Sequence, residues 1–174
     1  MKFRLPSCAA ILVAIISTFA SVDASAQKGE KSVGLRAGFT TRNTTATAGL
    51  YFSYRFSDHF RIAPKIDYAF QHNSTDAFAI NFDTEYPIAL GASRRVNFYP
   101  IAGLNFSTYN THYTVENEDE SLDSSHRTNH LGINLGAGLE YFATPTLRLA
   151  LESKCLFVKQ YTGGWFSLSI GYRF

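Results

Sequence analysis

The sequence predicts an all-β protein, an antiparallel up-and-down barrel, from three observations. Apolar and polar residues alternate in eight segments, and each segment keeps one parity from end to end. Aromatic residues make up 15% of the chain and charged residues only 17%, against about 25% in ordinary soluble domains. The chain also ends inside such a segment, WFSLSIGYRF, where most chains fray into polar residues. Strands therefore account for most of the chain, up to its last residue.

The first 26 residues have the pattern of a secretory signal peptide. MKFR carries two positive charges, AAILVAIISTFASV is apolar and uncharged, and Ala24 and Ala26 supply the small residues of a cleavage site. The apolar stretch of about 14 residues is too short for a membrane helix, which needs about 20. We therefore expect residues 1–26 to be removed after export through the Sec pathway, and residues 27–174 to form one barrel domain.

The eight segments follow one another as the strands of such a barrel would. In chain order they cover residues 31–42, 46–57, 60–71, 77–90, 95–108, 129–142, 146–158 and 164–174. Each is long enough to cross a bilayer as a tilted strand, which takes about 9–11 residues. Pro64 and Pro100 fit this pattern poorly, because proline donates no hydrogen bond to a strand ladder. They mark either bulges or segment limits that are displaced by one or two residues.

The volume of the side chains, compared with the space inside the barrel, decides which face of each strand points outward. An eight-stranded barrel has an interior only just wide enough to be filled by side chains. The apolar faces carry Phe, Tyr, Leu and Ile, which are too bulky for that space, whereas the opposite faces combine charged residues with many glycines. We therefore predict a transmembrane barrel with lipid outside and a polar, filled lumen. The predicted lumen charge network consists of Arg36, Arg55, Arg61, Lys65, Asp67, Asp83, Glu85, Glu140, Arg148, Glu152, Lys154 and Arg173.

With these features the chain from about residue 31 onward resembles the eight-stranded outer-membrane β-barrel family. That family includes OmpX, the opacity-type proteins and the membrane domain of OmpA. The resemblance implies an integral protein of the outer membrane of a Gram-negative bacterium, in contact with outer-membrane lipid and lipopolysaccharide. In the family, a last strand of alternating apolar residues with a terminal phenylalanine is the signal for the barrel-assembly machinery. The residues that match this signal are Phe166, Leu168, Ile170, Tyr172 and Phe174.

The segment 110–129 is predicted to be a long extracellular loop and the main candidate for function. Its candidate contact surface consists of five carboxylates, Glu116, Glu118, Asp119, Glu120 and Asp123, which are balanced only by Arg127. Calcium is one alternative ligand, but the spacing matches no EF-hand loop. A solvated loop and a contact surface for host proteins, lipopolysaccharide or an envelope protein are the others. We favour a structural or surface-interaction role, in adhesion or binding, with a surface ligand at this loop.

Two other functions remain open from the sequence. A narrow pore for small solutes is disfavoured because an eight-stranded barrel leaves little room for water. Small outer-membrane enzymes that modify lipid A resemble this chain in size and use a Ser and a His near the rim, but SSHRTNH, residues 124–130, lacks their His-x-Ser-Asn pattern. We therefore predict no enzyme activity and assign no catalytic, cofactor-binding or metal-binding residue. The formal charge of +2 gives no argument for a nucleic-acid partner.

Overall fold

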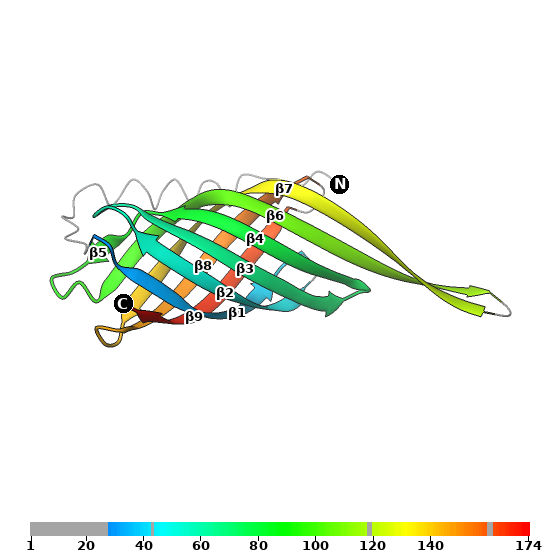
Figure 1. The fold of residues 1–174 in the computed structure, drawn as a ribbon, viewed down its shortest axis with the longest axis horizontal. Helices are drawn as coiled ribbons and strands as arrows, with labels where there is room; N and C mark the ends of the chain where they lie inside the picture. The colour runs from blue at the N-terminus through cyan, green and yellow to red at the C-terminus, as the bar shows by residue number, and fades with distance from the viewer. Residues whose placement is uncertain (1–27, 43, 118–119, 160–161) are drawn as a thin grey trace.

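Strand pairing follows chain order and then closes on itself. The structure, a computed structural model, describes residues 28–42, 44–117, 120–159 and 162–174, so the predicted signal peptide lies outside the described residues. The strands are β1 (Lys31–Thr40), β2 (Thr45–Arg55), β3 (Arg61–His72), β4 (Thr75–Glu85), β5 (Ile88–Leu90), β6 (Val96–Asn117), β7 (Glu120–Phe142), β8 (Leu147–Val158) and β9 (Gly163–Arg173). All are joined in one antiparallel sheet (Figure 1).

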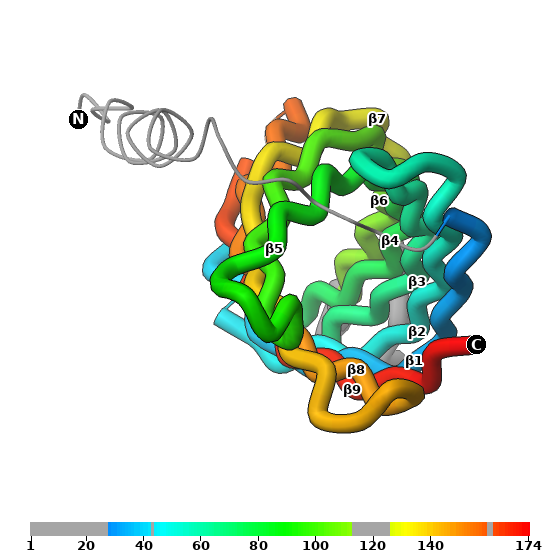
Figure 2. The backbone as a smooth tube through the Cα atoms, turned by 90° about the vertical axis from the view of Figure 1, so that its left-hand side faces the viewer, coloured from blue at the N-terminus to red at the C-terminus, as the bar shows by residue number. Residues whose placement is uncertain are grey.

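The sheet is a closed ring of eight barrel strands. Its order is β4-β3-β2-β1-β9-β8-β7-β6-β5, and a further pairing of β4 with β6 closes it. β4 and β5 pair with β6 in one continuous register, Glu85 with Ile101 and Ile88 with Phe98, so they form a single barrel strand interrupted at residues 86–87. Figure 2, a view close to the barrel axis, shows the ring. The predicted fold is confirmed.

The two prolines interrupt ladders without shifting them. The β2–β3 ladder lacks pairs at Pro64 and the residue before it, and keeps the same register on both sides of this gap. Pro100 lies opposite the break between β4 and β5, where the Tyr86 N–H donates to the Pro100 carbonyl at 3.2 Å. The register shift of β3 lies instead between Ala69 and His72. The prediction of bulges at these prolines was wrong, because a missing donor removes hydrogen bonds but adds no residue.

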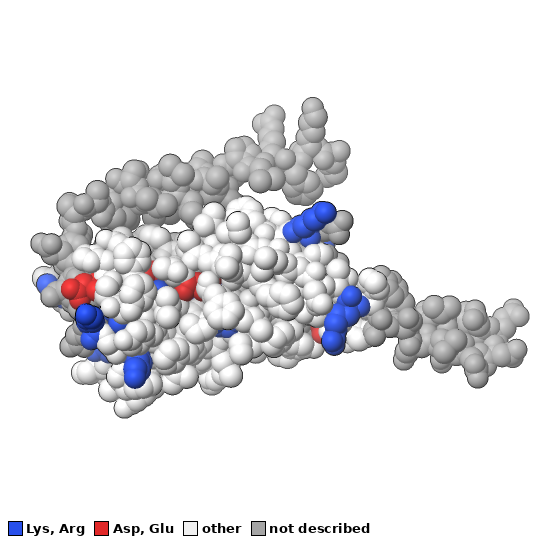
Figure 3. Space-filling view, turned by 45° about the horizontal axis from the view of Figure 1, so that its top comes forward, with Lys and Arg blue, Asp and Glu red and all other residues white. Residues whose placement is uncertain are grey.

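In each strand the residues that point outward are mainly apolar, and the alternate residues that point inward are mainly polar. Leu168 is 65% exposed on the outside of β9, whereas Arg61 is 1% exposed inside β3. Lys and Arg gather mainly at the two ends of the barrel, with a largely uncharged band between them (Figure 3). Exposed aromatic residues lie near both ends of this band, as interfacial girdles require. At the end with the short turns they are Phe56, Phe60, Tyr86, Tyr141, Tyr172 and Phe174, and at the other end Phe39, Tyr68, Phe70, Phe78, Phe106, Phe157 and Phe166.

β6 and β7 continue far beyond the other strands as a two-stranded ribbon (Figure 1). They pair with one another as far as Asn117 and Glu120, whereas β4 accompanies β6 only to Thr111. β8 accompanies β7 only from Gly132 onward. We call residues 112–117 and 120–125 the ribbon. The prediction of a loop over 110–129 was wrong at the level of the backbone, because the described residues of this segment are paired strand.

The described residues contain no helix that is long and apolar enough to cross a membrane.

Replacing Leu168 by arginine is expected to lower the free energy of unfolding by about 2–4 kcal/mol, because Leu168 lies midway along β9 and a cation at the bilayer midplane is costly. The same change at Tyr172, near the end of the barrel, is expected to cost about 0–1 kcal/mol. Denaturant titration of the protein folded in phospholipid vesicles measures both values. A negligible loss for both variants would show that the apolar face does not contact lipid.

Candidate functional site

The inside of the barrel collects the buried charges of the described chain. Eleven of the twelve residues of the predicted lumen network are buried there, all except Arg173. Arg173 lies at the end with the short turns, where its Nη1 is 3.4 Å from Glu30 Oε2 and its Nε donates to the Pro145 carbonyl at 2.7 Å. Its guanidinium also stacks on the ring of Phe142 at 4.6 Å. Arg173 therefore belongs to the rim of the lumen rather than to its interior.

Glu140 is the centre of the first cluster of lumen charges. Its carboxylate accepts hydrogen bonds from Arg61 Nη1 at 2.8 Å and from Arg148 Nε at 2.6 Å. Asn97 Nδ2 donates to the other carboxylate oxygen at 2.9 Å, and Arg55 Nη2 lies 3.9 Å away. Since burying a charge is costly unless it is paired and hydrogen-bonded, these partners are what allow Glu140 to remain ionised inside the barrel.

Lys65 joins this cluster to a second one further along the lumen. Its Nζ lies 2.8 Å from Glu85 Oε1, 3.2 Å from Asp83 Oδ2 and 2.9 Å from Glu152 Oε1. Glu152 also meets Arg36 Nη2 at 3.1 Å. Charges of opposite sign thus alternate along the lumen, and the ammonium group of Lys65 uses its donors on protein carboxylates.

Three buried asparagines extend the network towards the ribbon end of the barrel. Asn81 Nδ2 donates to Asp67 Oδ2 at 3.0 Å, and Asn134 Nδ2 donates to Asp83 Oδ1 at 2.8 Å. Asn105 Nδ2 donates to Asn81 Oδ1 at 2.8 Å. The sequence analysis missed these residues, although each lies on the inward parity of its strand. Parity was therefore the signal that identifies them.

Tyr99 is a large uncharged side chain inside the charged part of the lumen. It is 0% exposed, and its hydroxyl donates to Glu152 Oε1 at 3.1 Å. The guanidinium groups of Arg61 and Arg148 lie 5.0 and 5.6 Å from its ring centroid, within the range of cation–π contacts. A Cβ atom at Gly138 would overlap the Tyr99 ring, so the glycine makes room for this side chain.

An apolar layer lies inside the lumen between the asparagines and the ribbon end. It is a buried cluster of Ala69, Ala77, Tyr109, Leu156, Val158 and Trp165. β3 and β8, which supply Ala69 and Leu156, lie on opposite sides of the ring, so the layer crosses the lumen. A narrow apolar constriction excludes ions because water does not remain in it. The sequence analysis did not single out this layer, since it considered only the charged residues of the inward parity.

A polar cluster of a different kind lies on the outward face at the base of the ribbon. We call Tyr68, Asp76, Asn110, His112 and Arg127 the rim cluster. The Asp76 carboxylate is 2.9 Å from His112 Nε2 and accepts from Asn110 Nδ2 at 3.1 Å and from the Tyr68 hydroxyl at 3.4 Å. Arg127 Nε donates to Asn110 Oδ1 at 3.0 Å. A hydrogen bond from the backbone N–H of His112 to the Ser74 carbonyl at 2.7 Å fixes β6 to the β3–β4 turn.

The residues considered for catalysis lie apart from this cluster. His130 is on the inward face, with its ring centroid 6.0 Å from that of Tyr109. His126 pairs with Thr111 at the base of the ribbon and is exposed. Ser124 and Ser125 are on the β7 strand of the ribbon, where only the backbone is described.

The acidic residues of segment 110–129 lie only partly within the described structure. Glu118 and Asp119 lie outside the described residues. Glu116, Glu120 and Asp123 are strand residues of the ribbon, and only their backbone is described. The side chains that are described contain no group of three or more His, Cys, Asp or Glu residues that would hold a metal ion.

The last strand presents the predicted assembly signal outward. Phe166, Leu168, Ile170, Tyr172 and Phe174 are all exposed on the outer face of the barrel. β9 pairs with both β8 and β1, and Phe174 exchanges two backbone hydrogen bonds of 2.9 Å with Lys31. The last residue thus takes part in closing the barrel, while its recognition by the assembly machinery stays a prediction.

Comparison with known proteins gives one family and several structural neighbours. The family model described as outer membrane protein beta-barrel domain matches residues 8–174. No curated protein sequence matches the chain.

The structural neighbours are similar in fold at low sequence identity. The N-terminal β-barrel domain of Pseudomonas aeruginosa OprF is 16% identical with a TM-score of 0.61, covering 84% of this chain and 98% of its own. Ail, the attachment invasion locus protein of Yersinia pestis, is 15% identical with a TM-score of 0.60, covering 85% and 100%. A major outer membrane protein of Thermus thermophilus is 15% identical with a TM-score of 0.66, again covering 85% and 100%.

Replacing Glu140 by glutamine is expected to lower the free energy of unfolding by about 3–5 kcal/mol, because it removes the anion that buried arginines share. The matched control is Asp58→Asn in an exposed turn, which is expected to change the stability by less than about 0.5 kcal/mol. Denaturant titration in vesicles measures both. Equal stability of the two variants would show that the lumen charges do not depend on one another.

Proposed function

The chain belongs to the outer membrane protein beta-barrel domain family, and on this premise we propose that it is a closed barrel of the outer membrane with a surface-interaction role. The family places the protein in the bacterial outer membrane. Export through the Sec pathway and insertion through the C-terminal strand belong to the same proposal. In this proposal the ribbon contacts the binding partner, and the barrel holds the ribbon above the membrane.

The filling of the lumen supports a barrel closed to bulk solutes. The cations and carboxylates of the interior are hydrogen-bonded or ion-paired with one another, so few donors or acceptors remain for passing ions. The apolar layer then crosses the lumen at the ribbon end. A narrow pore would have to pass both obstacles, and for this reason we do not favour it.

The open edges of the ribbon carry the proposed surface-interaction role. Residues 112–117 and 120–125 pair with one another, and within the described part of the chain no third strand pairs with either of them. Apart from the His112 N–H, which donates to Ser74, their outer edges thus present backbone N–H and C=O groups that an extended peptide can pair with by strand addition. A two-stranded ribbon in water is only marginally stable by itself, so a partner strand would also stabilise it. One structural neighbour is named an attachment invasion locus protein, a role that such a ribbon would serve here.

An enzymatic role has less support. Acyl transfer by a histidine–carboxylate pair requires a hydroxyl or thiol nucleophile beside the imidazole. Among the described side chains, the hydrogen-bond partner of the His112 ring is Asp76. We therefore propose a protein without enzyme activity.

The mature protein refolded into a planar bilayer is expected to be silent in single-channel recordings, because the apolar layer and the paired charges block the lumen. Heat-modifiable migration of the same sample on a gel controls for correct folding. Steady, reproducible conductance from a heat-modifiable sample would overturn the closed barrel.

Replacing residues 112–125 by the turn dipeptide Asn-Gly is expected to abolish adherence of bacteria that display the protein to a surface coated with extracellular-matrix proteins. The new turn joins Thr111 to its pairing partner His126, a geometry that Asn-Gly favours, so the barrel should fold. Heat-modifiable migration and surface amount are measured alongside adherence.

The matched control keeps the ribbon and removes three of its charges, through Glu116→Gln, Glu120→Gln and Asp123→Asn. We expect this variant to adhere as the parent does, because strand addition uses the backbone. Loss of adherence in this control would assign the contact to the acidic side chains. Full adherence of the shortened variant would overturn the role of the ribbon.

A further inference from the structure

The rim cluster lies at the depth where lipid headgroups meet the barrel. Tyr68 supplies its hydroxyl to Asp76 and its ring to the aromatic girdle, where Phe70 packs against it edge-on at 5.6 Å. Phe78, two residues from Asp76 on the same strand and the same parity, is also exposed in this girdle. Since aromatic girdles mark the membrane–water interface, the polar groups directly above this one face the headgroups of the outer leaflet.

Arg127 is held at its Nε, and among the described side chains its two terminal nitrogens have no partner. Its Nε donates to Asn110 Oδ1, and its exposed side chain has no other hydrogen bond or ion pair within the described part of the chain. The terminal nitrogens carry four of the five N–H donors of the guanidinium group, arranged as a fork that fits phosphate oxygens. Asn110 is fixed in turn by its donation to Asp76. The arginine is thereby pre-oriented, which reduces the entropy lost on binding a ligand.

Among the described side chains at this end of the barrel, basic residues outnumber carboxylates. The Asp76 side chain is only 10% exposed and is covered by the donors of the rim cluster, so its charge is largely satisfied. The His112 side chain is 49% exposed. Arg42 and Lys159 are exposed beyond the same ends of β1 and β8. Asp76 is the one carboxylate among the described side chains at this end.

We propose that the rim cluster binds the phosphate of a glycolipid headgroup in the outer leaflet, with Arg127 as the phosphate ligand and Asn110 and Asp76 as positioning residues. This inference rests on the outer-membrane placement, but it does not require the ribbon to bind any partner. It adds a lipid site on the outside of the barrel to the proposed surface-interaction role.

The test measures binding of lipid A with two phosphates to the protein in phosphatidylcholine nanodiscs, by native mass spectrometry. Arg127→Gln is expected to weaken binding about tenfold, the size of a charge-assisted hydrogen-bond pair. Arg127→Lys keeps the charge without the fork and is expected to bind with intermediate strength. Asn110→Ala is expected to weaken binding about threefold, because it releases Arg127 without removing its charge.

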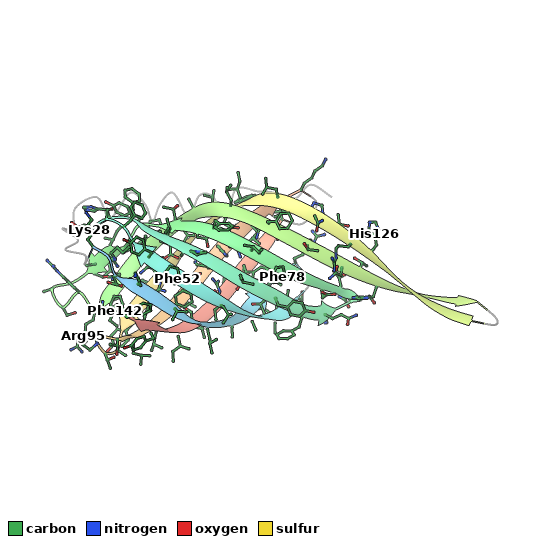
Figure 4. All side chains as sticks on the ribbon, viewed as in Figure 1. Lys28, Phe52, Phe78, Arg95, His126 and Phe142 are labelled. Atoms are coloured by element: carbon green, nitrogen blue, oxygen red, sulfur yellow. The ribbon has the colours of Figure 1, made fainter. Side chains whose placement is uncertain are left out.

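Arg95→Gln is the matched control, since it removes the same charge from the opposite end of the barrel (Figure 4). We expect it to bind lipid A as the parent does. Dephosphorylated lipid A is expected to bind the parent protein and Arg127→Gln with equal strength. Inorganic phosphate at equal concentration is expected not to compete with lipid A.

Four results would each overturn the site. They are unchanged binding by Arg127→Gln, an equal loss for Arg95→Gln, equal binding of dephosphorylated lipid A, and competition by inorganic phosphate. Heat-modifiable migration of every variant shows that the barrel is folded. Because the shortened variant also removes His112 of the rim cluster, adherence is measured for Arg127→Gln as well, which keeps the whole ribbon. Parental adherence with weakened binding of lipid A in Arg127→Gln tests the two proposals separately.

Discussion

The width of an eight-stranded ring is the constraint on which the rest of the structure depends. Such a ring has room for side chains but little for anything else, so each inward residue must fit its neighbours across the lumen. Gly138 leaves space for the Tyr99 ring, and a Cβ atom at Gly171 would meet the hydroxyl of Tyr51. Because the inward charges are buried, each also needs a partner of opposite charge. The small inward residues and the paired inward charges thus both follow from the narrow width of the ring.

Closure of the barrel gives the backbone N–H and C=O groups hydrogen-bond partners, just as ion pairing gives partners to the buried charged side chains. In a bilayer every backbone N–H and C=O group needs an internal partner, and only a closed ring leaves no edge. β1 and β9 supply the closing ladder, and the two hydrogen bonds between Lys31 and Phe174 extend it to the last residue. Where β6 and β7 leave the ring, this requirement no longer holds, because water satisfies an open edge. The open edges of the ribbon are therefore compatible with the aqueous side of the barrel and not with its wall.

The period of two predicted which residues lie inside and which outside, but not which of them meet. Eight strands and the buried position of residues such as Glu140 follow from parity alone. The partners of Glu140 come from β3 and β8, and their meeting depends on the tilt and stagger of the strands, which parity does not contain. The ribbon was missed for another reason. Its sequence consists mostly of polar and charged residues, so the long apolar alternation that marks a membrane strand is absent while the hydrogen-bonded ladder is present.

The same residue type has opposite roles on the two faces of one wall. Arg61 is buried among Glu85, Glu140 and the Tyr99 ring, so its guanidinium group is committed to the protein and stabilises the barrel. Arg127 has a single amide oxygen as its partner and projects from the outer face at the rim. A ligand competes with existing partners in the first case and with water alone in the second. Because the lumen of so small a barrel must satisfy its own charges, the groups still able to bind a ligand are those on the outside and at the ribbon. Binding by this barrel is for that reason expected at its surface rather than through its interior.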